Sequence, residues 1–329
     1  MQGEYIRRNG YPLEVHKAET PDGFILTLFR IPGERGATPV YLQHGLVDSS
    51  DSWFCMGRNR SIGFTLADAG YDVWAGNFRG NVYSSGHKRL KPEMREYWDF
   101  SWDTLGLIDV RVMIQYILQT SGQPDLIHIG HSMGTTSFFV AASSDDRLNQ
   151  LVRAHVALAP ITSFEYSSSP VFSAQFIEPL ITVMSFPYIL PELIRLLFRT
   201  LPKSSSLKEF LHYLQQRQAG RLFFYDYGTE ERNMLEYGSP TPPEVDFGKI
   251  KVPVYFVYGP NDLFTSVEDL QASYQKLGNP AGFFAVGRPD WNHGDFLITI
   301  DVRCTLTKAI VLDILGKHQN ERDDGVNFR

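Results

Sequence analysis

Residues 126–134 read Leu126-Ile-His-Ile-Gly-His-Ser-Met-Gly134, and a run of small side chains follows as far as Ala142. The apolar run predicts a buried strand, and the stretch after it predicts a helix. Between them lies a Gly-x-Ser-x-Gly turn, in which the glycines leave room for neighbouring backbone and the serine hydroxyl projects over the sheet edge. An ordinary turn is the alternative, but the strand-turn-helix setting favours Ser132 as a nucleophile.

Outward from this turn, strands and helices alternate along the chain. An opening hairpin is predicted from residues 13–18 and 24–31. Further strands are expected at residues 40–43, 71–75, 126–129, 152–159, 254–258 and 283–286, and helices at 62–69, 103–120, 267–277 and 306–315. This order predicts an α/β fold with a mostly parallel central sheet flanked by helices.

A serine hydroxyl reacts at neutral pH only if a histidine accepts its proton and a carboxylate orients that histidine. In enzymes with this kind of serine turn, the acid and then the histidine follow along the chain, each after a core strand. Asp262 follows the predicted strand 254–258, and His293 follows the predicted strand 283–286. We therefore expect Asp262 and His293 to be the partners of Ser132.

Other acids and histidines fit these two roles less well. Asp290 and Asp295 are too close in sequence to His293, and Asp269 falls inside the predicted helix 267–277. Helix capping or solvation is the expected role of all three. The remaining histidines lie inside the turn, in a strand, in the C-terminal tail or away from strand ends: His131, His128, His318, His16, His87, His155 and His212.

The same chemistry needs N–H donors for the oxyanion. The predicted strand 40–43 leads into His44-Gly45-Leu46, and a His-Gly pair at this place is the expected companion of the serine turn. The backbone N–H groups of Leu46 and Met133 are the expected donors. We expect the His44 ring to hold the loop by hydrogen bonds.

Several blocks of sequence match one family in the family's own order. They are Asn9-Gly-Tyr-Pro12, Leu42-Gln-His-Gly-Leu46, Gly76-Asn-Phe-Arg-Gly-Asn81, Tyr97-Trp-Asp-Phe-Ser-Trp102, residues 130–136, Tyr225-Asp-Tyr-Gly228, Gly259-Pro-Asn-Asp262 and Asn292-His-Gly-Asp-Phe296. Together they resemble the acid lipase family of α/β-hydrolases, which includes gastric lipase, lysosomal acid lipase and insect digestive lipases. The resemblance implies an α/β-hydrolase fold, a triad of Ser132, Asp262 and His293, and oxyanion donors at Leu46 and Met133.

Residues 161–245 interrupt the alternation. They are expected to form a mainly helical cap over a core made of residues 1–160 and 246–329. Members of the family usually have a longer insertion here that contains a cysteine pair, whereas this interval is short and contains no cysteine. Its apolar side chains, which either receive an acyl chain or simply pack the cap onto the core, are Ile181, Met184, Phe186, Tyr188 and Leu190.

The composition of the chain limits the classes of partner that we expect. The chain of 329 residues, 43% of them hydrophobic, is sufficient for one catalytic core with an insertion. A net charge of −6 without a basic cluster gives no support for a nucleic-acid partner. Cys55 and Cys304 are the only cysteines and lie far apart, so we expect neither a metal site nor a cofactor.

Localisation rests on the resemblance, which implies a secreted or lysosomal protein. The first residues lack the apolar run of a signal peptide, so either it was removed from this numbering or this form is cytosolic. Asn59-Arg-Ser61 is a glycosylation sequon, usable only in the secretory pathway. The longest charge-free run between residues 171 and 201 is 179–191, too short to cross a bilayer. The charged tail from Lys317 to Arg329 is expected to be mobile.

Together these features predict a serine ester hydrolase, a lipase that cleaves apolar acyl esters such as triglycerides or sterol esters through an acyl-enzyme on Ser132. One alternative is a carboxylesterase for small soluble esters, if the trimmed cap exposes the site. Another is a non-catalytic lipid-binding protein that retains the fold. The oligomeric state does not follow from these residues.

Two further features have both a functional and a structural interpretation. Arg79, between two Gly-Asn pairs, suits a substrate carboxylate or the fixing of a turn. Trp98, Phe100 and Trp102 suit a pocket wall or the core. We expect the structural role in each case.

Overall fold

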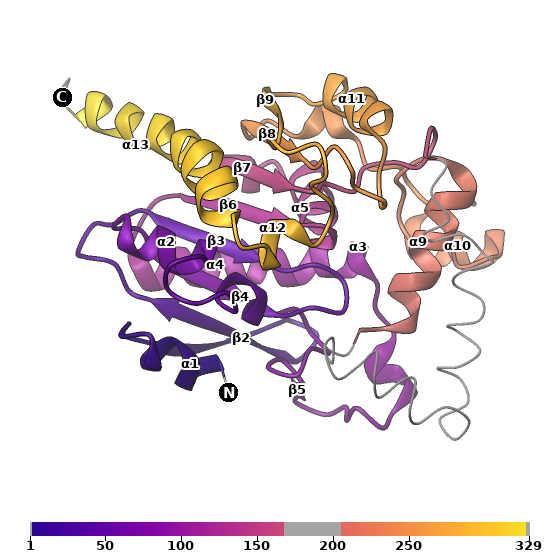
Figure 1. Cartoon of the computed structure of the whole chain (residues 1–329). Coiled ribbons are helices and arrows are strands. Elements are labelled where there is room, and N and C mark those ends of the chain that lie inside the picture. Colours follow the sequence, from indigo (N-terminus) through magenta and orange to yellow (C-terminus); the bar gives the residue numbers. More distant parts are fainter. Residues whose placement is uncertain (1, 168–204, 327–329) are drawn as a thin grey trace, which may run out of the picture.

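The computed structural model of the chain describes residues 2–167 and 205–326 (Figure 1). Within these ranges the central element is a nine-stranded sheet in the order β1-β2-β4-β3-β6-β7-β8-β9, with β5 paired to β2. The strands are β1 Glu14–Glu19, β2 Phe24–Ile31, β3 Pro39–Gln43, β4 Asp72–Gly76, β5 Gly86–His87, β6 Leu126–His131, β7 Val152–Leu158, β8 Val254–Tyr258 and β9 Pro280–Ala285. The pairs that involve β2 are antiparallel, and the strands from β4 to β9 in the sheet order are parallel. This confirms the predicted α/β fold class.

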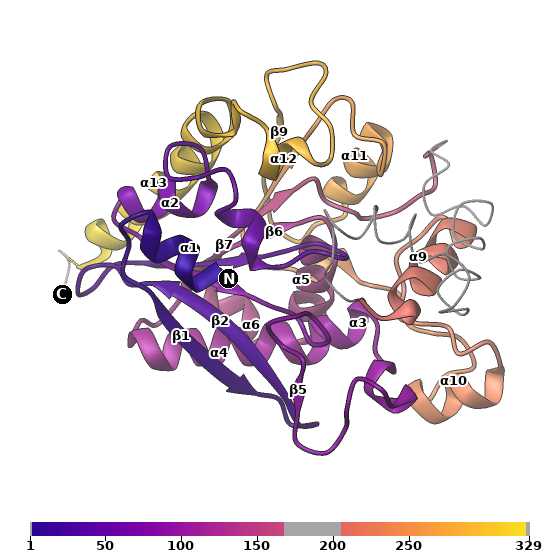
Figure 2. The same ribbon diagram turned by 60° about the horizontal axis from the view of Figure 1, so that its bottom comes forward.

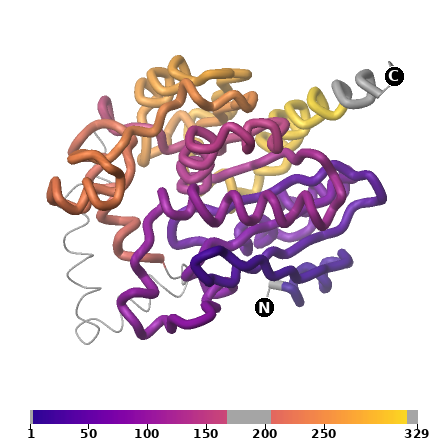
Figure 3. Tube along the Cα trace, turned by 180° about the vertical axis from the view of Figure 1, so that it is seen from behind, coloured from indigo at the N-terminus to yellow at the C-terminus, as the bar shows by residue number. Residues whose placement is uncertain are grey.

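Helices cover both faces of this sheet. The α-helices of the described ranges are α1 Gln2–Arg8, α2 Ile62–Asp68, α3 Trp102–Thr104, α4 Arg111–Ser121, α5 Met133–Ser144, α6 Leu148–Leu151, α9 Leu207–Ala219, α10 Glu230–Tyr237, α11 Val267–Gln275, α12 Asp295–Ile298 and α13 Leu312–Val326. Helices α2, α12 and α13 lie in front of the sheet in Figure 1. Seen from behind, the helices of residues 100–150 cover the other face (Figure 3).

The inner strands β3, β4 and β6 are buried along their whole length because both faces of the sheet are covered there, whereas most residues of the edge strand β1 are half-buried or exposed. Alternate side chains enter different hydrophobic clusters: in β3, Val40 and Leu42 pack against the side of α2 and α13, whereas Tyr41 packs against the side of α4 and α5. This alternation is the two-residue period of a strand. It explains why continuous apolar runs, rather than alternating patterns, marked these strands in the sequence.

Two helical predictions differ from the structure. The segment predicted as one helix at 103–120 consists of α3, a π-helical stretch Leu105–Val110 and α4. Gly106 permits a close approach to α5 there, since a Cβ would lie 2.4 Å from the Ser137 carbonyl oxygen. The last helix, predicted to end at residue 315, continues as α13 to Val326, and His318 is buried with its Nε2 2.9 Å from the Tyr255 hydroxyl, while the mobility of the charged tail stays a prediction.

The order of the strands locates the site. From β3 the chain goes to β4 on one side of β3 and later reaches β6 on the other side. Ligand sites of open α/β sheets lie at the carboxyl ends of the strands beside such a reversal. The loop at Leu46 follows β3, and Ser132 follows β6, so both lie at this reversal.

The described part of residues 161–245 lies at one end of the molecule. Helices α9 and α10 are found there in both Figure 1 and Figure 2. Helix α9 is attached to the core by His212, whose ring stacks on Trp102 with centroids 3.7 Å apart, and by Tyr213, whose hydroxyl donates to Thr136 Oγ1 over 3.2 Å. The division into core and cap stays a prediction. The predicted acyl-chain wall lies outside the described residues: Ile181, Met184, Phe186, Tyr188 and Leu190.

Of the helices in the two described ranges, none combines the length and the apolar character needed to cross a membrane.

Candidate active site

Ser132 occupies a sharp turn between β6 and α5, with φ 54° and ψ −122°. Glycines flank this turn because the backbone is crowded. A Cβ on Gly130 would lie 2.8 Å from the Gly134 carbonyl, and a Cβ on Gly134 would lie 2.5 Å from the Gln43 carbonyl oxygen. Real side chains do not tolerate such distances to backbone atoms. The turn therefore presents the serine at the carboxyl end of β6.

The three side chains chosen from chain order lie in one hydrogen-bonded line. His293 Nε2 is 2.8 Å from Ser132 Oγ, and His293 Nδ1 is 2.8 Å from Asp262 Oδ2. The Asp262 side chain is 2% exposed and the His293 side chain 12% exposed. Because a carboxylate only accepts, Nδ1 carries the proton, and Nε2 is free to accept from the serine hydroxyl. This arrangement can remove a proton from Ser132.

The loops that carry the acid and the histidine are fastened to each other. The Asn261 N–H donates to the Trp291 carbonyl over 3.0 Å. The other oxygen of Asp262 accepts the Phe264 N–H over 2.8 Å, and the Phe264 ring stacks on His293 with centroids 4.2 Å apart. Both partners of the serine are therefore held from two sides, which is what a preorganised site requires.

The loop after β3 closes over the serine from the other strand. A Cβ on Gly45, the residue before Leu46, would lie 3.0 Å from Ser132 Cβ, so the loop packs against the serine at this point. Met133 is the first residue of α5, where backbone N–H groups point out of the helix. In the described part of the chain, neither the Leu46 nor the Met133 N–H makes a hydrogen bond. Two N–H groups without a partner among the described residues thus occur in the loop and the turn next to Ser132, and their role as oxyanion donors stays a prediction.

His44 holds this loop by its ring, as expected. Its Nδ1 donates to the Gly45 carbonyl over 2.8 Å, and its Nε2 accepts the Phe78 N–H over 3.2 Å. The ring is buried, and both nitrogens are used by the backbone. His44 therefore has a structural role.

Three non-glycine residues of the described ranges have positive φ: Val47 at 51°, Ser132 at 54° and Ala159 at 47°. They lie just beyond β3, β6 and β7, which are neighbours in the sheet. Left-handed backbone is unfavourable for such residues, most of all for a β-branched valine. The carboxyl edge of the sheet is thus strained at three adjacent positions.

The competing acids have other partners. Asp290 pairs with Arg288, and the closest of their contacts is 2.6 Å. Asp269 accepts from Ser266 Oγ over 2.8 Å at the start of α11, and Asp295 accepts the Asn292 N–H over 2.9 Å at the start of α12. Asp269 is buried rather than solvated, because its other oxygen also accepts from Ser163 Oγ over 2.6 Å and from the Tyr166 N–H over 3.2 Å.

Arg79, Phe100 and Trp102 are structural, as expected, whereas Trp98 is half-buried and lines a surface pocket. The Arg79 guanidinium is buried between two carboxylates, 2.7 Å from Asp109 and 2.5 Å from Asp22. It has no exposed face with which to bind a substrate. Phe100 and Trp102 are buried in the core.

The sequence did not indicate the role of one residue near the site, His131. His131 is buried, and its Nε2 donates to the His293 carbonyl over 3.0 Å. The residue before the serine is the last of β6, so its side chain points to the opposite face from its neighbours. In the sequence, only its position next to Ser132 indicates that His131 lies near the site. That position does not indicate that its partner is the His293 carbonyl.

Cys55 and Cys304 are both exposed free thiols. Among the described residues, no group of three or more His, Cys, Asp or Glu side chains could hold a metal ion.

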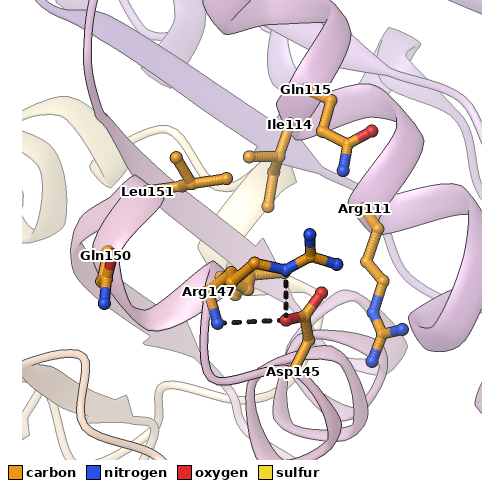
Figure 4. A pocket seen from close by; sticks show the side chains of 8 residues that line it. Arg111, Ile114, Gln115, Asp145, Arg147, Gln150 and Leu151 are labelled. Carbon is orange, nitrogen blue, oxygen red and sulfur yellow. Dashed lines mark hydrogen bonds and ion pairs between the residues drawn. The ribbon is translucent and has the colours of Figure 1, made fainter.

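A separate pocket of about 250 Å³ lies between α4 and the turn from α5 to α6 (Figure 4). Arg147 turns toward Asp145 there, with Arg111 beside them. Asp145 directly follows α5, whereas Ser132 directly precedes it, and a helix of 12 residues is about 18 Å long. The pocket is therefore remote from the serine and has no part in its chemistry.

A parallel α/β sheet with a Ser-His-Asp line at its carboxyl edge defines the α/β-hydrolase class. The chain matches the family described as alpha/beta hydrolase fold over residues 38–297, and the partial alpha/beta-hydrolase lipase region over residues 3–57. It is 35% identical to Lipase 1 of Drosophila melanogaster, over 95% of this chain and 79% of that protein. It is 33% identical to the gastric triacylglycerol lipase of Rattus norvegicus, over 89% of this chain and 86% of that protein. The chain belongs to the lipase family of α/β-hydrolases, and its function is that of a carboxylic ester hydrolase of the lipase type.

Solved structures of low sequence identity share the fold. An esterase of Pyrococcus furiosus has a TM-score of 0.57 at 16% identity, over 95% of this chain and 93% of that chain. An esterase of a Rhodococcus species has a TM-score of 0.52 at 18% identity, over 93% of this chain and 98% of that chain. At such identities the likeness concerns the fold alone.

Proposed function

We propose that this protein hydrolyses apolar acyl esters, with triglycerides or sterol esters as substrates, through an acyl-enzyme on Ser132. The observation that carries the proposal is the contact of 2.8 Å from His293 Nε2 to Ser132 Oγ, with Asp262 on the other ring nitrogen. A buried line of this kind is what a serine needs in order to attack an ester carbonyl.

The proposed reaction has two halves. In the first, Ser132 Oγ attacks the carbonyl carbon while His293 Nε2 takes the hydroxyl proton, and Asp262 stabilises the resulting imidazolium. The Leu46 and Met133 N–H groups bind the oxygen that becomes negative. The C–O bond to the alcohol then breaks, and His293 returns its proton to the leaving oxygen.

In the second half, water takes the place of the alcohol. His293 accepts a proton from the water, whose oxygen attacks the acyl carbon. The bond to Ser132 Oγ then breaks, and the serine regains its proton from His293. The fatty acid leaves, and no redox step or cofactor is needed.

Two observations support an apolar substrate. One relative is named a gastric triacylglycerol lipase. In addition, large exposed apolar side chains occur beside Asp262 and at the end of α12, the helix that follows the His293 loop: Leu263, Ile298 and Ile300. Apolar side chains around a serine site suit an acyl chain or a lipid-water interface better than a charged substrate.

We further propose that residues 161–245 form the cap, and that it is shorter than in relatives. The alignment with Lipase 1 of Drosophila melanogaster extends over 356 positions, more than the 329 residues of this chain, so the relative carries residues that this chain lacks. A short cap favours the second candidate, a carboxylesterase for small soluble esters, because less of the chain shields the serine.

Secretion or a lysosomal location is proposed from the relatives. The sequon residue Asn59 is exposed, which supports its use if the chain enters the secretory pathway. A mobility shift on treatment with a glycosidase, absent in Asn59→Gln, would test this.

The test of the activity combines labelling and turnover. A fluorophosphonate should form an adduct on Ser132, located by mass spectrometry, and turnover of p-nitrophenyl esters should rise with acyl chain length. Ser132→Ala, matched in fold by circular dichroism, should neither label nor turn over. A labelled enzyme that prefers short chains would point to the carboxylesterase. A folded wild-type protein without an adduct would contradict the proposal and favour lipid binding.

A further inference from the structure

The first turn of α9 contains a carboxyl group in an unusual environment. Ser206 and Glu209 form a capping box, in which the Ser206 N–H donates to Glu209 Oε2 over 2.8 Å. Such boxes normally lie at the protein surface, where water solvates the acid. Here Glu209 is only 2% exposed. The charged group that acts on it, Asp109, is itself negative, so the acid is held without a cation among the described residues.

The other contact of this carboxyl group leads to the active-site loop. Ser205 lies next to the Glu209 carboxyl group, and its Oγ accepts the Val47 N–H over 3.0 Å. Ser205 and Val47 are 158 positions apart in sequence. Ser205, directly before the Ser206 N-cap of α9, therefore connects the start of this helix to the residue that follows Leu46.

Val47 is a residue whose backbone needs such a restraint. Its φ of 51° is unfavourable for a β-branched side chain, so the surroundings must hold it. The Val47 N–H and the Leu46 carbonyl share one rigid peptide plane. Fixing this N–H restrains the Leu46 carbonyl and, through the Leu46 backbone, the preceding peptide that carries the Leu46 N–H, next to Gly45, where a Cβ would lie 3.0 Å from Ser132 Cβ.

We propose that Ser205 and Glu209 are positioning residues that aim the Leu46 amide at the oxyanion. The proposal rests on the proposed function, because it assumes that Leu46 is an oxyanion donor. Ser205 touches neither substrate nor the reacting atoms and acts through Val47. The cap side of the molecule thereby completes the oxyanion hole.

Helix α9 does not depend on Ser205 for its place. Its second and third turns are anchored by His212, which bonds to Ser101 Oγ and to the Phe223 carbonyl, each over 2.8 Å. Tyr213 adds the contact with Thr136. Removal of the Ser205 hydroxyl should consequently change the loop and leave the helix in position.

The test is Ser205→Ala, measured by steady-state turnover of a p-nitrophenyl ester. We expect kcat to fall roughly 10- to 100-fold, because a misdirected donor stabilises the oxyanion poorly. KM should stay within about twofold, because the donor acts in the transition state. Ser205→Thr, which keeps a hydroxyl, should recover kcat. Glu209→Gln, which keeps the shape of the side chain, should lower kcat less than Ser205→Ala does.

The matched control is Thr229→Ala. Thr229 caps α10 by accepting the Arg232 N–H over 3.3 Å and is exposed. This variant removes a helix cap from the same region and should leave kcat unchanged. A folded Ser205→Ala with wild-type kcat would overturn the inference. Failure of the proposed function is separate, since the wild-type protein would then form no fluorophosphonate adduct on Ser132.

Discussion

The imidazole of His131 lies beside that of His293, with ring centroids 4.9 Å apart, but its hydrogen bond goes to the His293 backbone carbonyl. Burial lowers the pKa of His131 to about 3, so the ring is neutral near pH 7 and donates from Nε2. A neutral ring here places no positive charge next to the imidazolium that the proposed mechanism forms. His131 thus fixes the histidine loop without opposing its protonation.

Replacement of His131 by phenylalanine should lower kcat about tenfold with little change in KM, because the loop loses its hydrogen bond while the packing remains. His131→Gln, which keeps an N–H, should lose less. Steady-state kinetics of the two variants checks this. Equal rates for His131→Phe and wild type would contradict the assigned role.

Asp262→Asn should lower kcat roughly 10³- to 10⁴-fold while the protein stays folded. The asparagine amide cannot stabilise an imidazolium, and it favours the wrong tautomer of His293. Turnover assays with circular dichroism on the same sample measure both effects. Asp290→Asn is the control, because Asp290 pairs with Arg288 and is exposed. It should remain within twofold of wild type.

Arg79→Ala should destabilise the fold by about 3–5 kcal/mol, because the fully buried Asp109 carboxylate then lacks its cation. Urea unfolding gives the free energy. The matched variant Arg288→Ala removes an exposed ion pair and should cost less than about 1 kcal/mol. A raised KM in Arg79→Ala with unchanged stability would instead mean that the residue binds substrate.

Buried histidines make the stability of the fold sensitive to acid. Desolvation lowers the pKa of His131 and His155 to about 3 and that of His212 to about 4. Between these values and the ordinary value of about 6.5, the unfolded chain binds more protons than the folded one. Stability is therefore fully present above pH 6.5 and falls as the pH decreases. From pH 6.5 to 5 the loss is on the order of 2 kcal/mol per histidine.

Glu209 has the opposite effect on the pH dependence of stability, and over a different pH range. Burial raises its pKa to about 8, so between about 4.5 and 8 the folded protein binds the extra proton, and stability falls as the pH rises. Below pH 6.5 the loss of stability from the three histidines is larger than the gain from Glu209. Between pH 6.5 and 8, of these four groups, Glu209 alone changes the stability. Thermal unfolding should accordingly show a maximum Tm near pH 6.5. Glu209→Gln should flatten the alkaline side, and an unchanged pH profile of this variant would contradict the assignment.

The strands were predictable because both faces of the sheet are buried, which leaves apolar runs such as residues 254–258, observed as β8 with the same bounds. The continuation of α13 beyond residue 315 was not predicted, because its second half is rich in charge. The contact of His318 with Tyr255 is what reveals that it belongs to the fold. Local composition does not contain a contact between residues 63 positions apart.

Chain order and strand ends were enough to choose Ser132, Asp262 and His293, which the structure brings into contact, although their catalytic roles stay a prediction. The supporting residues were not predictable. Ser205 and Val47 carry no motif, and a valine gives no sign that its φ is positive. Such contacts arise only when distant segments pack together.

The left-handed residues at the ends of β3, β6 and β7 also bear on how this enzyme would adapt to heat. A substitution that relieves the backbone strain at Val47, Ser132 or Ala159 should raise the stability of the fold. The same substitution would move a backbone group at the carboxyl edge of the sheet, beside the site. Selection for thermal stability alone should therefore favour substitutions along this edge first. The resulting proteins would be more stable but would have a lower kcat. A thermophilic relative that stays fast would have to gain its stability elsewhere, in the helical layers.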